Sequence, residues 1–134
     1  VQMFTRLYVD ADDCPVKSEV YRLAQRYGLN VILVSSADIG APFESWITKV
    51  VAGSGNVATI IANEAAPRDM VITDNPNLAA DVRAKGATAM TVRGQHWTAE
   101  GPRPILPESK RGSNKARFEA VLDDELRARS KAGF

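Results

Sequence analysis

The strongest constraint on the fold is an alternation along the chain of short aliphatic runs and amphipathic helical patterns. The run at 31–34 is continuous and aliphatic, which is typical of a strand buried on both faces of a sheet. Helical patterns lie between most of the runs, and parallel strands need such crossovers. We therefore expect an α/β fold, a three-layer sandwich around a mainly parallel sheet of about five strands. The expected strands are residues 7–10, 31–34, 47–51, 70–73 and 88–92.

Four helices are expected, each from an apolar stripe at helical spacing and from its boundary residues. The first begins at Pro15 and ends at Gly28. Asn56 is expected to cap the second helix, and Asn75 the third. The last helix covers about residues 115–131 and follows an extended segment rich in Gly, Pro and polar residues.

The length of 134 residues is enough for one domain with one core. We expect residues 1–95 to form the α/β core. Residues 96–134 are expected to add a Pro/Gly-rich connector and the C-terminal helix to the same single domain.

The composition excludes several classes of protein. Hydrophobic residues make up 45% and charged residues 25%, which is ordinary for a folded domain. One cysteine and one histidine exclude a disulfide framework and a His- or Cys-rich metal site. No apolar run approaches the roughly 20 residues of a membrane span, and residues 1–20 lack the pattern of a signal peptide. We therefore expect a cytoplasmic protein without a membrane partner.

Acidic residues follow the ends of two expected strands. The first strand ends in Asp10-Ala11-Asp12, and Asp74 follows the fourth. Because ligands of an open parallel sheet bind beyond the carboxyl ends of its strands, these carboxylates are candidates for a functional site. Mg²⁺ prefers oxygen ligands and is commonly held by one or two carboxylates with water. If the two strands are neighbours, Asp10, Asp12 and Asp74 meet and form a site for a divalent metal ion.

Helix capping is the competing interpretation of these acids. Asp12 or Asp13 stands shortly before Pro15, and Asp74 belongs to an Asp-Asn-Pro sequence that precedes the third helix. Capping does not account for Asp10, which lies within the strand. Both interpretations stay open at this point.

Basic residues gather near the start of the last helix. The stretch 103–117 carries five Lys or Arg residues and one acid, Glu108, whereas the whole chain has a net charge of +1. Such a density of cations is typical of phosphate binding, and Lys110 and Arg111 are our candidates for contacts with a nucleic acid. A solvated linker with solubilising charges would have the same composition.

Cys14 and His96 are weaker candidates for catalysis. Cys14 stands near the start of the first helix, where the pKa of a thiol can be depressed. His96 lies in the distant Gly/Pro-rich segment, so a Cys/His catalytic pair is not expected.

The segment at 8–17 reads Tyr-Val-Asp-Ala-Asp-Asp-Cys-Pro-Val-Lys and resembles the opening signature of the YaiI/YqxD family of uncharacterised bacterial proteins. The resemblance covers residues 7–94 well and residues 109–123 in part. Further similar segments lie at 69–73, 78–80 and 85–87, and at the Ser-Lys-Arg and Arg-Phe motifs of 109–111 and 117–118.

This family is placed in the PIN-like superfamily, whose characterised members are ribonucleases that depend on Mg²⁺ or Mn²⁺ and carry acidic residues at strand ends. The resemblance therefore implies a PIN-like fold and a metal-dependent nuclease with RNA as its partner. For such an activity, Asp10, Asp12 and Asp74 are our candidates both for the catalytic residues and for the ligands of Mg²⁺ or Mn²⁺. The candidate substrate-binding residues are Lys17, Thr73, Asn75, Lys110 and Arg111.

The chain departs from the family pattern in three places. Residues 55–59 carry no acid, although the family usually has acids after its third strand. The family's acid after the fourth strand stands where this chain has Asn75, and Asp74 lies one place earlier. The helix expected after the fifth strand is shortened to the Pro-rich connector. The metal site thus has fewer acids than the family pattern provides.

Three functions remain open from the sequence. The first is a Mg²⁺- or Mn²⁺-dependent nuclease that hydrolyses phosphodiester bonds in RNA. The second is a non-catalytic module that binds a nucleic acid or a nucleotide at the same edge. The third is a haloacid-dehalogenase-like phosphatase, because Asp10-Ala11-Asp12 at the end of a first strand is also that superfamily's nucleophile and acid. The sequence does not indicate an oligomeric state.

Overall fold

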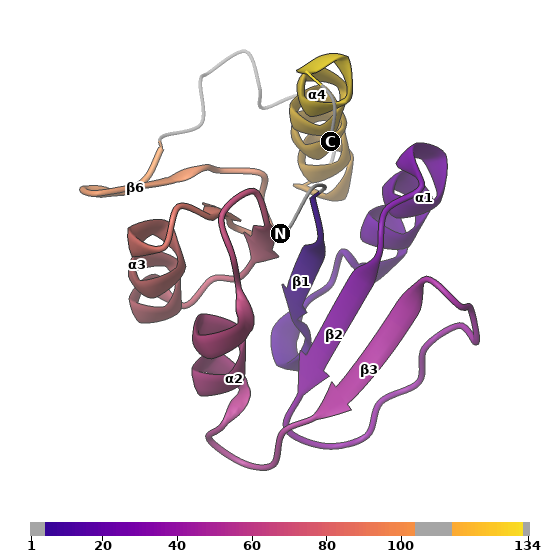
Figure 1. The fold of residues 1–134 in the computed structure, drawn as a ribbon, viewed down its shortest axis with the longest axis vertical. Helices are drawn as coiled ribbons and strands as arrows, with labels where there is room; N and C mark the ends of the chain where they lie inside the picture. The colour runs from indigo at the N-terminus through magenta and orange to yellow at the C-terminus, as the bar shows by residue number, and fades with distance from the viewer. Residues whose placement is uncertain (1–4, 104–113, 133–134) are drawn as a thin grey trace.

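The computed structural model describes residues 5–103 and 114–132 and shows a five-stranded sheet with helices on both faces (Figure 1). The strands of the sheet are β1 (Leu7–Asp10), β2 (Val31–Ser35), β3 (Ile47–Val51), β4 (Met70–Ile72) and β5 (Thr88–Met90). The helices are α1 (Lys17–Tyr27), α2 (Val57–Glu64), α3 (Pro76–Ala84) and α4 (Asn114–Ala132). A short 3-10 helix, η1 (Ala11–Asp13), follows β1.

All strand pairs of this sheet are parallel, in the order β3-β2-β1-β4-β5. Val9 in the central strand is paired with Leu33 on one side and with Ile72 on the other. The α/β class and the parallel sheet of five strands are confirmed. So is the adjacency of β1 and β4, which brings the residues after both strands to one edge.

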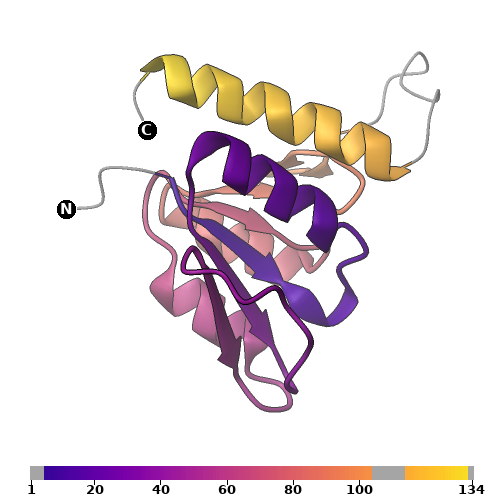
Figure 2. The same cartoon turned by 90° about the vertical axis from the view of Figure 1, so that its right-hand side faces the viewer.

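The core is divided between the two faces of the sheet. Side chains alternate along a strand, so Leu7 and Val9 pack toward α1 and α4, whereas Tyr8 packs toward α2 and α3. Figure 2 shows α1 and α4 side by side over one face. Phe118, Leu122 and Leu126 of α4 are fully buried in the same cluster as α1. The result is the expected three-layer sandwich.

The helix boundaries follow the sequence signals with two differences. Gly28 ends α1 in the left-handed conformation, and the Asn75 side chain caps α3 by accepting from the backbone N–H groups of Asn77 and Leu78. However, α1 begins at Lys17 rather than at Pro15. Asn56 precedes α2 without a side-chain cap. Its Nδ2 donates to the carbonyl of Ala52 instead, which closes the turn after β3.

The segment after β5 is more ordered than the sequence predicted. Two short antiparallel strands, β6 (Trp97–Thr98) and β7 (Gly101–Pro102), form a hairpin within the expected connector. Thr98 Oγ1 donates to the carbonyl of Gly101 and accepts from the backbone N–H of Glu100. These local hydrogen bonds pair the polar groups of the turn. The strands are only two residues long, so the sequence shows no alternating hydrophobic pattern here.

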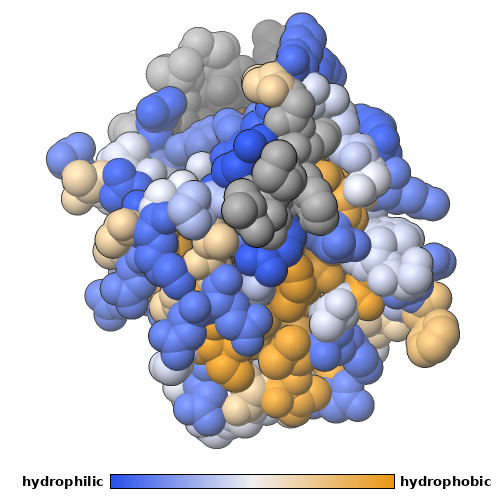
Figure 3. All heavy atoms as spheres, viewed as in Figure 1, coloured by the Kyte–Doolittle hydropathy of each residue, from blue (hydrophilic) through white to orange (hydrophobic). Residues whose placement is uncertain are grey.

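The described residues on the face in Figure 3 are mostly hydrophilic, but hydrophobic side chains gather on its lower part, over α2 and the neighbouring ends of β2 and β3. β3 lies at one edge of the sheet and is partly exposed, and Val51 at its end is 54% exposed. Among the described residues, no helix combines the length and the apolar composition needed to cross a bilayer.

Candidate acidic site at the edge of the sheet

A cavity of about 220 Å³ lies at the carboxyl edge of the sheet, at the ends of the central strands β1 and β4. Asp10, Asp12 and Asp74 line it together with Asn75 and Val92. The three acids come from the end of β1, from η1 and from the loop after β4. Parallel pairing of β1 with β4 therefore places all three predicted carboxylates around one cavity.

Asp10 is tied to the neighbouring strand by a buried hydroxyl. Thr73, at the end of β4, is 1% exposed, and its Oγ1 donates a 2.9 Å hydrogen bond to Asp10 Oδ2. The same Oγ1 accepts from the backbone N–H of Asn75 at 2.9 Å. The hydroxyl thus fixes the carboxylate of Asp10 relative to the loop that carries the other acid.

Asp12 is exposed and is fixed from the opposite side of β1. Its Oδ1 accepts a 2.8 Å hydrogen bond from the backbone N–H of Ser36, directly after β2. The turn of η1 brings this side chain back over the sheet edge. Among the described residues, nothing donates to its second oxygen, Oδ2, which is therefore available to a ligand.

Asp74 is oriented by the segment that follows β5. Its Oδ1 accepts a 2.9 Å hydrogen bond from the backbone N–H of Val92. Within the part of the chain that the structure describes, its Oδ2 likewise accepts no hydrogen bond. A group at the end of a neighbouring strand thus donates a hydrogen bond to each of the three carboxylates.

Helix capping does not explain these acids. Val16 is the residue before α1 and provides no side-chain cap, so Asp12 does not cap this helix. Asn75 caps α3, while Asp74 binds Val92. The capping interpretation is wrong for both residues, and their carboxylates are oriented by the loops that line the cavity.

The donor set of the cavity suits a hard divalent cation, because carboxylate oxygens are the ligands that Mg²⁺ and Mn²⁺ prefer. Within residues 5–103 and 114–132, no three His, Cys, Asp or Glu side chains are close enough together to hold one metal ion. Mg²⁺ usually keeps several waters and uses only one or two carboxylates. An ion in this cavity would therefore be held by one or two acids and by water, which differs from the expected three converging ligands.

A second pocket, of about 450 Å³, adjoins the acidic cavity and shares Asp74 and Val92 with it. Its lining adds two cationic side chains, Arg93 from the segment after β5 and Lys115 from the first turn of α4. Both side chains are exposed. We call it the basic pocket. An anionic group in the basic pocket would lie beside the carboxylates of the acidic cavity.

Comparison with models of protein families identifies the family of the chain. The model of the YaiI/YqxD family, which is described as uncharacterised, matches residues 8–127. The chain belongs to the YaiI/YqxD family. This result confirms the resemblance seen in the signature at 8–17.

Curated bacterial relatives support the same assignment. UPF0178 proteins of Rhodopseudomonas palustris strain TIE-1 and of Bradyrhizobium sp. strain ORS 278 are 46% and 45% identical over 98 and 96 residues, which cover 72% and 70% of this chain. A UPF0178 protein of Caulobacter sp. strain K31 is 42% identical over 98 residues, or 72% of the chain. The matched regions cover 62%, 58% and 65% of these relatives, so the chain spans about three fifths of their length. No solved structure matches the chain.

The candidate substrate-binding residues do not all lie at the acidic cavity. Asn75 lines the acidic cavity. Thr73 is buried behind it, so it positions Asp10 and does not face a substrate. Lys17 Nζ donates to the carbonyl of Cys14 at 3.1 Å and does not line either pocket. Lys110 and Arg111 lie outside the described residues.

Cys14 does not have the properties of a nucleophile. The residue is 6% exposed, and burial raises the pKa of its thiol, outweighing a backbone hydrogen bond from Val16 and the charge of Lys17. A thiolate is therefore disfavoured near neutral pH. His96 pairs with Glu125 at 3.3 Å on α4, away from the acidic cavity.

Sequence reasoning missed Arg93 and the backbone groups of Ser36 and Val92. Ser36 directly follows β2, and Val92 and Arg93 follow β5 closely, at the edge where the acids were sought. The rule that directed attention to the ends of β1 and β4 applies equally to the other strands. Applied to every strand, it would have identified Arg93 as a candidate.

Proposed function

We propose that the acidic cavity and the basic pocket together hydrolyse phosphodiester bonds in RNA with the aid of Mg²⁺ or Mn²⁺. The observation that carries this proposal is that the two pockets share Asp74 and Val92. A phosphate held in the basic pocket would lie next to the carboxylates that attract a cation. The resemblance to the PIN-like superfamily, in which acids at strand ends serve nucleases, supports the same function.

The carboxylates divide into two roles in this proposal. Asp10, fixed by Thr73, and Asp12, fixed by Ser36, would hold the cation. Asp74 would complete its hydration shell by accepting hydrogen bonds from bound water. A Mg²⁺ or Mn²⁺ ion, when bound, lowers the pKa of water and neutralises charge on a phosphate.

The cations of the basic pocket would position the substrate. Arg93 carries a guanidinium whose planar set of donors matches phosphate oxygens, and Lys115 adds a point charge. Arg93 has no ion pair with any described acid, so its charge is available. The substrate phosphate would then be held between these cations and the acidic cavity.

A second candidate function is a non-catalytic module that binds RNA or a nucleotide at the same edge. It is favoured by the absence, among the described residues, of three acids close enough to hold one ion. A phosphatase of the haloacid dehalogenase kind gains no such support. The nearest lysine in the signature, Lys17, donates to the carbonyl of Cys14.

The test combines metal binding with cleavage. Isothermal titration calorimetry with MgCl₂ and MnCl₂ measures binding, and gel analysis of a 5′-labelled single-stranded RNA measures cleavage with either metal or with EDTA. Asp10→Asn should weaken metal binding and lower cleavage at least a hundredfold. Asp81→Asn is the matched control, because Asp81 is exposed on α3 and does not line either pocket.

The outcomes separate the two candidates. Metal binding with cleavage that Asp10→Asn abolishes supports the nuclease. RNA binding without metal binding or cleavage would reject the nuclease and favour the binding module. Cleavage that survives Asp10→Asn would come from another site or a contaminant.

A further inference from the structure

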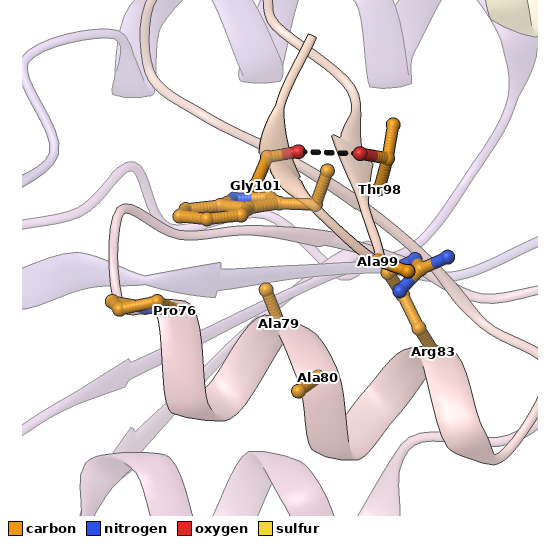
Figure 4. Close-up of a pocket in the computed structure, with 8 residues that line it drawn as sticks. Pro76, Ala79, Ala80, Arg83, Thr98, Ala99 and Gly101 are labelled. Carbon is orange, nitrogen blue, oxygen red and sulfur yellow. Dashed lines mark hydrogen bonds between the residues drawn. The ribbon is translucent and has the colours of Figure 1, made fainter.

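A third pocket, of about 350 Å³, lies between α3 and the β6–β7 hairpin (Figure 4). Figure 4 shows Ala79 and Ala80 on the helix, with Pro76 at one end of the pocket and Arg83 at the other. We call it the hairpin pocket. Its lining residues are Pro76, Ala79, Ala80, Arg83, Trp97, Thr98, Ala99 and Gly101.

The lining is apolar, and most of its side chains are small. Pro76, Ala79 and Ala80 leave space along α3, while Trp97 contributes a large flat ring from the hairpin. A slot between an aromatic ring and small apolar groups fits a planar ring better than a branched chain. Bases of single-stranded nucleic acids are commonly held by stacking on aromatic side chains.

Trp97 is fixed in position. Its ring is half-buried, and its Nε1 donates a 2.9 Å hydrogen bond to the backbone carbonyl of Thr73. The ring also packs against the core on the α2 and α3 face of the sheet. A rigid ring that lines a pocket needs little further ordering when it stacks on a ligand.

Arg83 supplies the charged group of the hairpin pocket. It is exposed, and within residues 5–103 and 114–132 its guanidinium makes no ion pair or hydrogen bond. A guanidinium only donates hydrogen bonds, so it suits a ligand whose edge carries acceptors. The nitrogen and carbonyl acceptors on the edge of a nucleobase have this character.

The hairpin pocket adjoins the acidic cavity through consecutive residues. Asp74 and Asn75 line the cavity, and the next residue, Pro76, lines the pocket. Thr73 links the two sites as well, because its carbonyl accepts from Trp97 of the hairpin pocket and its hydroxyl donates to Asp10 of the acidic cavity. A nucleotide, which carries a phosphate next to a flat ring, has the two groups that the acidic cavity and the hairpin pocket would bind.

We propose that the hairpin pocket holds a nucleobase whose own phosphate lies at the acidic cavity, with the base stacked on Trp97 and its edge facing Arg83. The inference rests on the proposed function, since it names the group of the substrate that the chain recognises. Two sources supply this chemistry, a free nucleotide and a single-stranded RNA. The experiment below separates them.

The test uses the fluorescence of Trp97 in a Trp46→Phe background, so that the indole of the hairpin pocket is the reporter. Titrations are made in EDTA and again in MgCl₂, with guanosine 5′-monophosphate, adenosine 5′-monophosphate, a single-stranded RNA tetranucleotide and ribose 5-phosphate. We expect saturable quenching by the probes that carry a base and none by ribose 5-phosphate. Saturation by the mononucleotides identifies a nucleotide site, and saturation by the tetranucleotide alone identifies an RNA strand.

Substitutions on α3 locate the ligand. Ala80 is exposed and lines the pocket, so Ala80→Leu fills it without disturbing the core and should weaken binding at least tenfold. Ala84 is exposed on the same helix and does not line the pocket, so Ala84→Leu should leave binding unchanged. Arg83→Ala should weaken binding severalfold.

The inference fails independently of the proposed function. Absent quenching, equal quenching by ribose 5-phosphate, or unchanged binding in Ala80→Leu would each overturn the base pocket, whether or not the protein cleaves RNA. Base binding that Ala80→Leu weakens in a protein without metal-dependent cleavage would support the pocket and reject the nuclease. Quenching has to be absent both in EDTA and in MgCl₂ to count against the pocket, because without a cation the carboxylates of the acidic cavity repel the phosphate of the ligand.

Discussion

Thr73 Oγ1 and Asp10 Oδ2, on neighbouring parallel strands, are joined by a hydrogen bond of 2.9 Å. The donor is buried, so it competes with little water for the carboxylate. The same hydroxyl accepts from the N–H of Asn75, which lines the acidic cavity. One hydroxyl thus couples the end of β1 to the loop after β4.

Replacing this hydroxyl should affect both stability and function. Thr73→Val keeps the shape of the side chain but removes the donor to Asp10 and the acceptor for Asn75, so we expect a loss of about 1–3 kcal/mol in the free energy of unfolding. Thr73→Ser keeps the hydroxyl and should retain RNA cleavage that Thr73→Val loses. Urea unfolding and the cleavage assay measure the two effects. Equal cleavage by both variants would show that Asp10 does not depend on Thr73.

Gly94 permits α4 to lie close to the end of the sheet. A Cβ at this position would lie 3.0 Å from Cα of Phe118 and 3.3 Å from the carbonyl oxygen of Arg117, and φ is +82°. Both neighbours are helix backbone, which cannot move without shifting α4. Gly94→Ala should therefore destabilise the protein through a strained backbone angle and through a steric clash.

Gly55 separates these two contributions. Its φ is +79°, but a Cβ there would have no neighbour within 4 Å. Gly55→Ala should cost roughly 1–2 kcal/mol from the left-handed backbone alone. Gly94→Ala should cost more, by at least about 1 kcal/mol. Equal losses in urea unfolding would mean that α4 adjusts to the added methyl group.

Glu125 should make stability depend on pH. Burial opposes its ionisation, but the hydrogen bond and charge of Arg129, with His96 beside it, outweigh burial and lower the pKa of the carboxyl. The ordinary pKa of glutamate is about 4.3, and the unfolded chain regains it. The contribution of Glu125 is therefore complete above about pH 4.3 and is lost as the pH falls through the lower folded pKa.

Glu125→Gln tests this dependence. Below about pH 4.3 the variant should lose less stability per pH unit than the unmodified protein, because the glutamine does not titrate. Other carboxylates titrate in both proteins, so the difference between their urea-unfolding curves across pH 3–7 isolates Glu125. Parallel curves would contradict the lowered pKa.

The central sheet was predictable because all of its strands except β3 are largely buried. Continuous aliphatic runs such as 31–34 are typical of strands that are covered on both faces, and helices between most of the runs favour parallel pairing. Parallel pairing then places the residues after β1 and β4 at the same carboxyl edge of the sheet. For this reason the shared cavity of Asp10 and Asp74 could be anticipated from sequence positions alone.

The orientation of each carboxylate was not predictable, because backbone groups from distant segments fix it. Asp12 is held by the N–H of Ser36, and Asp74 by the N–H of Val92. A backbone N–H is present at almost every residue, so no sequence pattern marks it. The β6–β7 hairpin was not predicted for a related reason, since Trp97 is fixed by a backbone carbonyl and by local turns.

The basic pocket should contribute to the salt dependence of RNA binding. Arg93 and Lys115 come from different elements but line one pocket, so both should contact phosphates if RNA binds there. The logarithm of RNA affinity falls linearly with the logarithm of salt concentration, and for single strands each phosphate contact contributes about 0.7 to that slope. The double variant Arg93→Ala, Lys115→Ala should therefore have a slope that is shallower by about 1.4. Lys131→Ala is the control, because Lys131 is exposed in the last turn of the same helix, far along α4 from Lys115. Fluorescence anisotropy of a labelled RNA at several salt concentrations measures the slopes. If the double variant and the control have the same slope, phosphates do not bind in the basic pocket, because cations that stay in water release no counterions from the RNA.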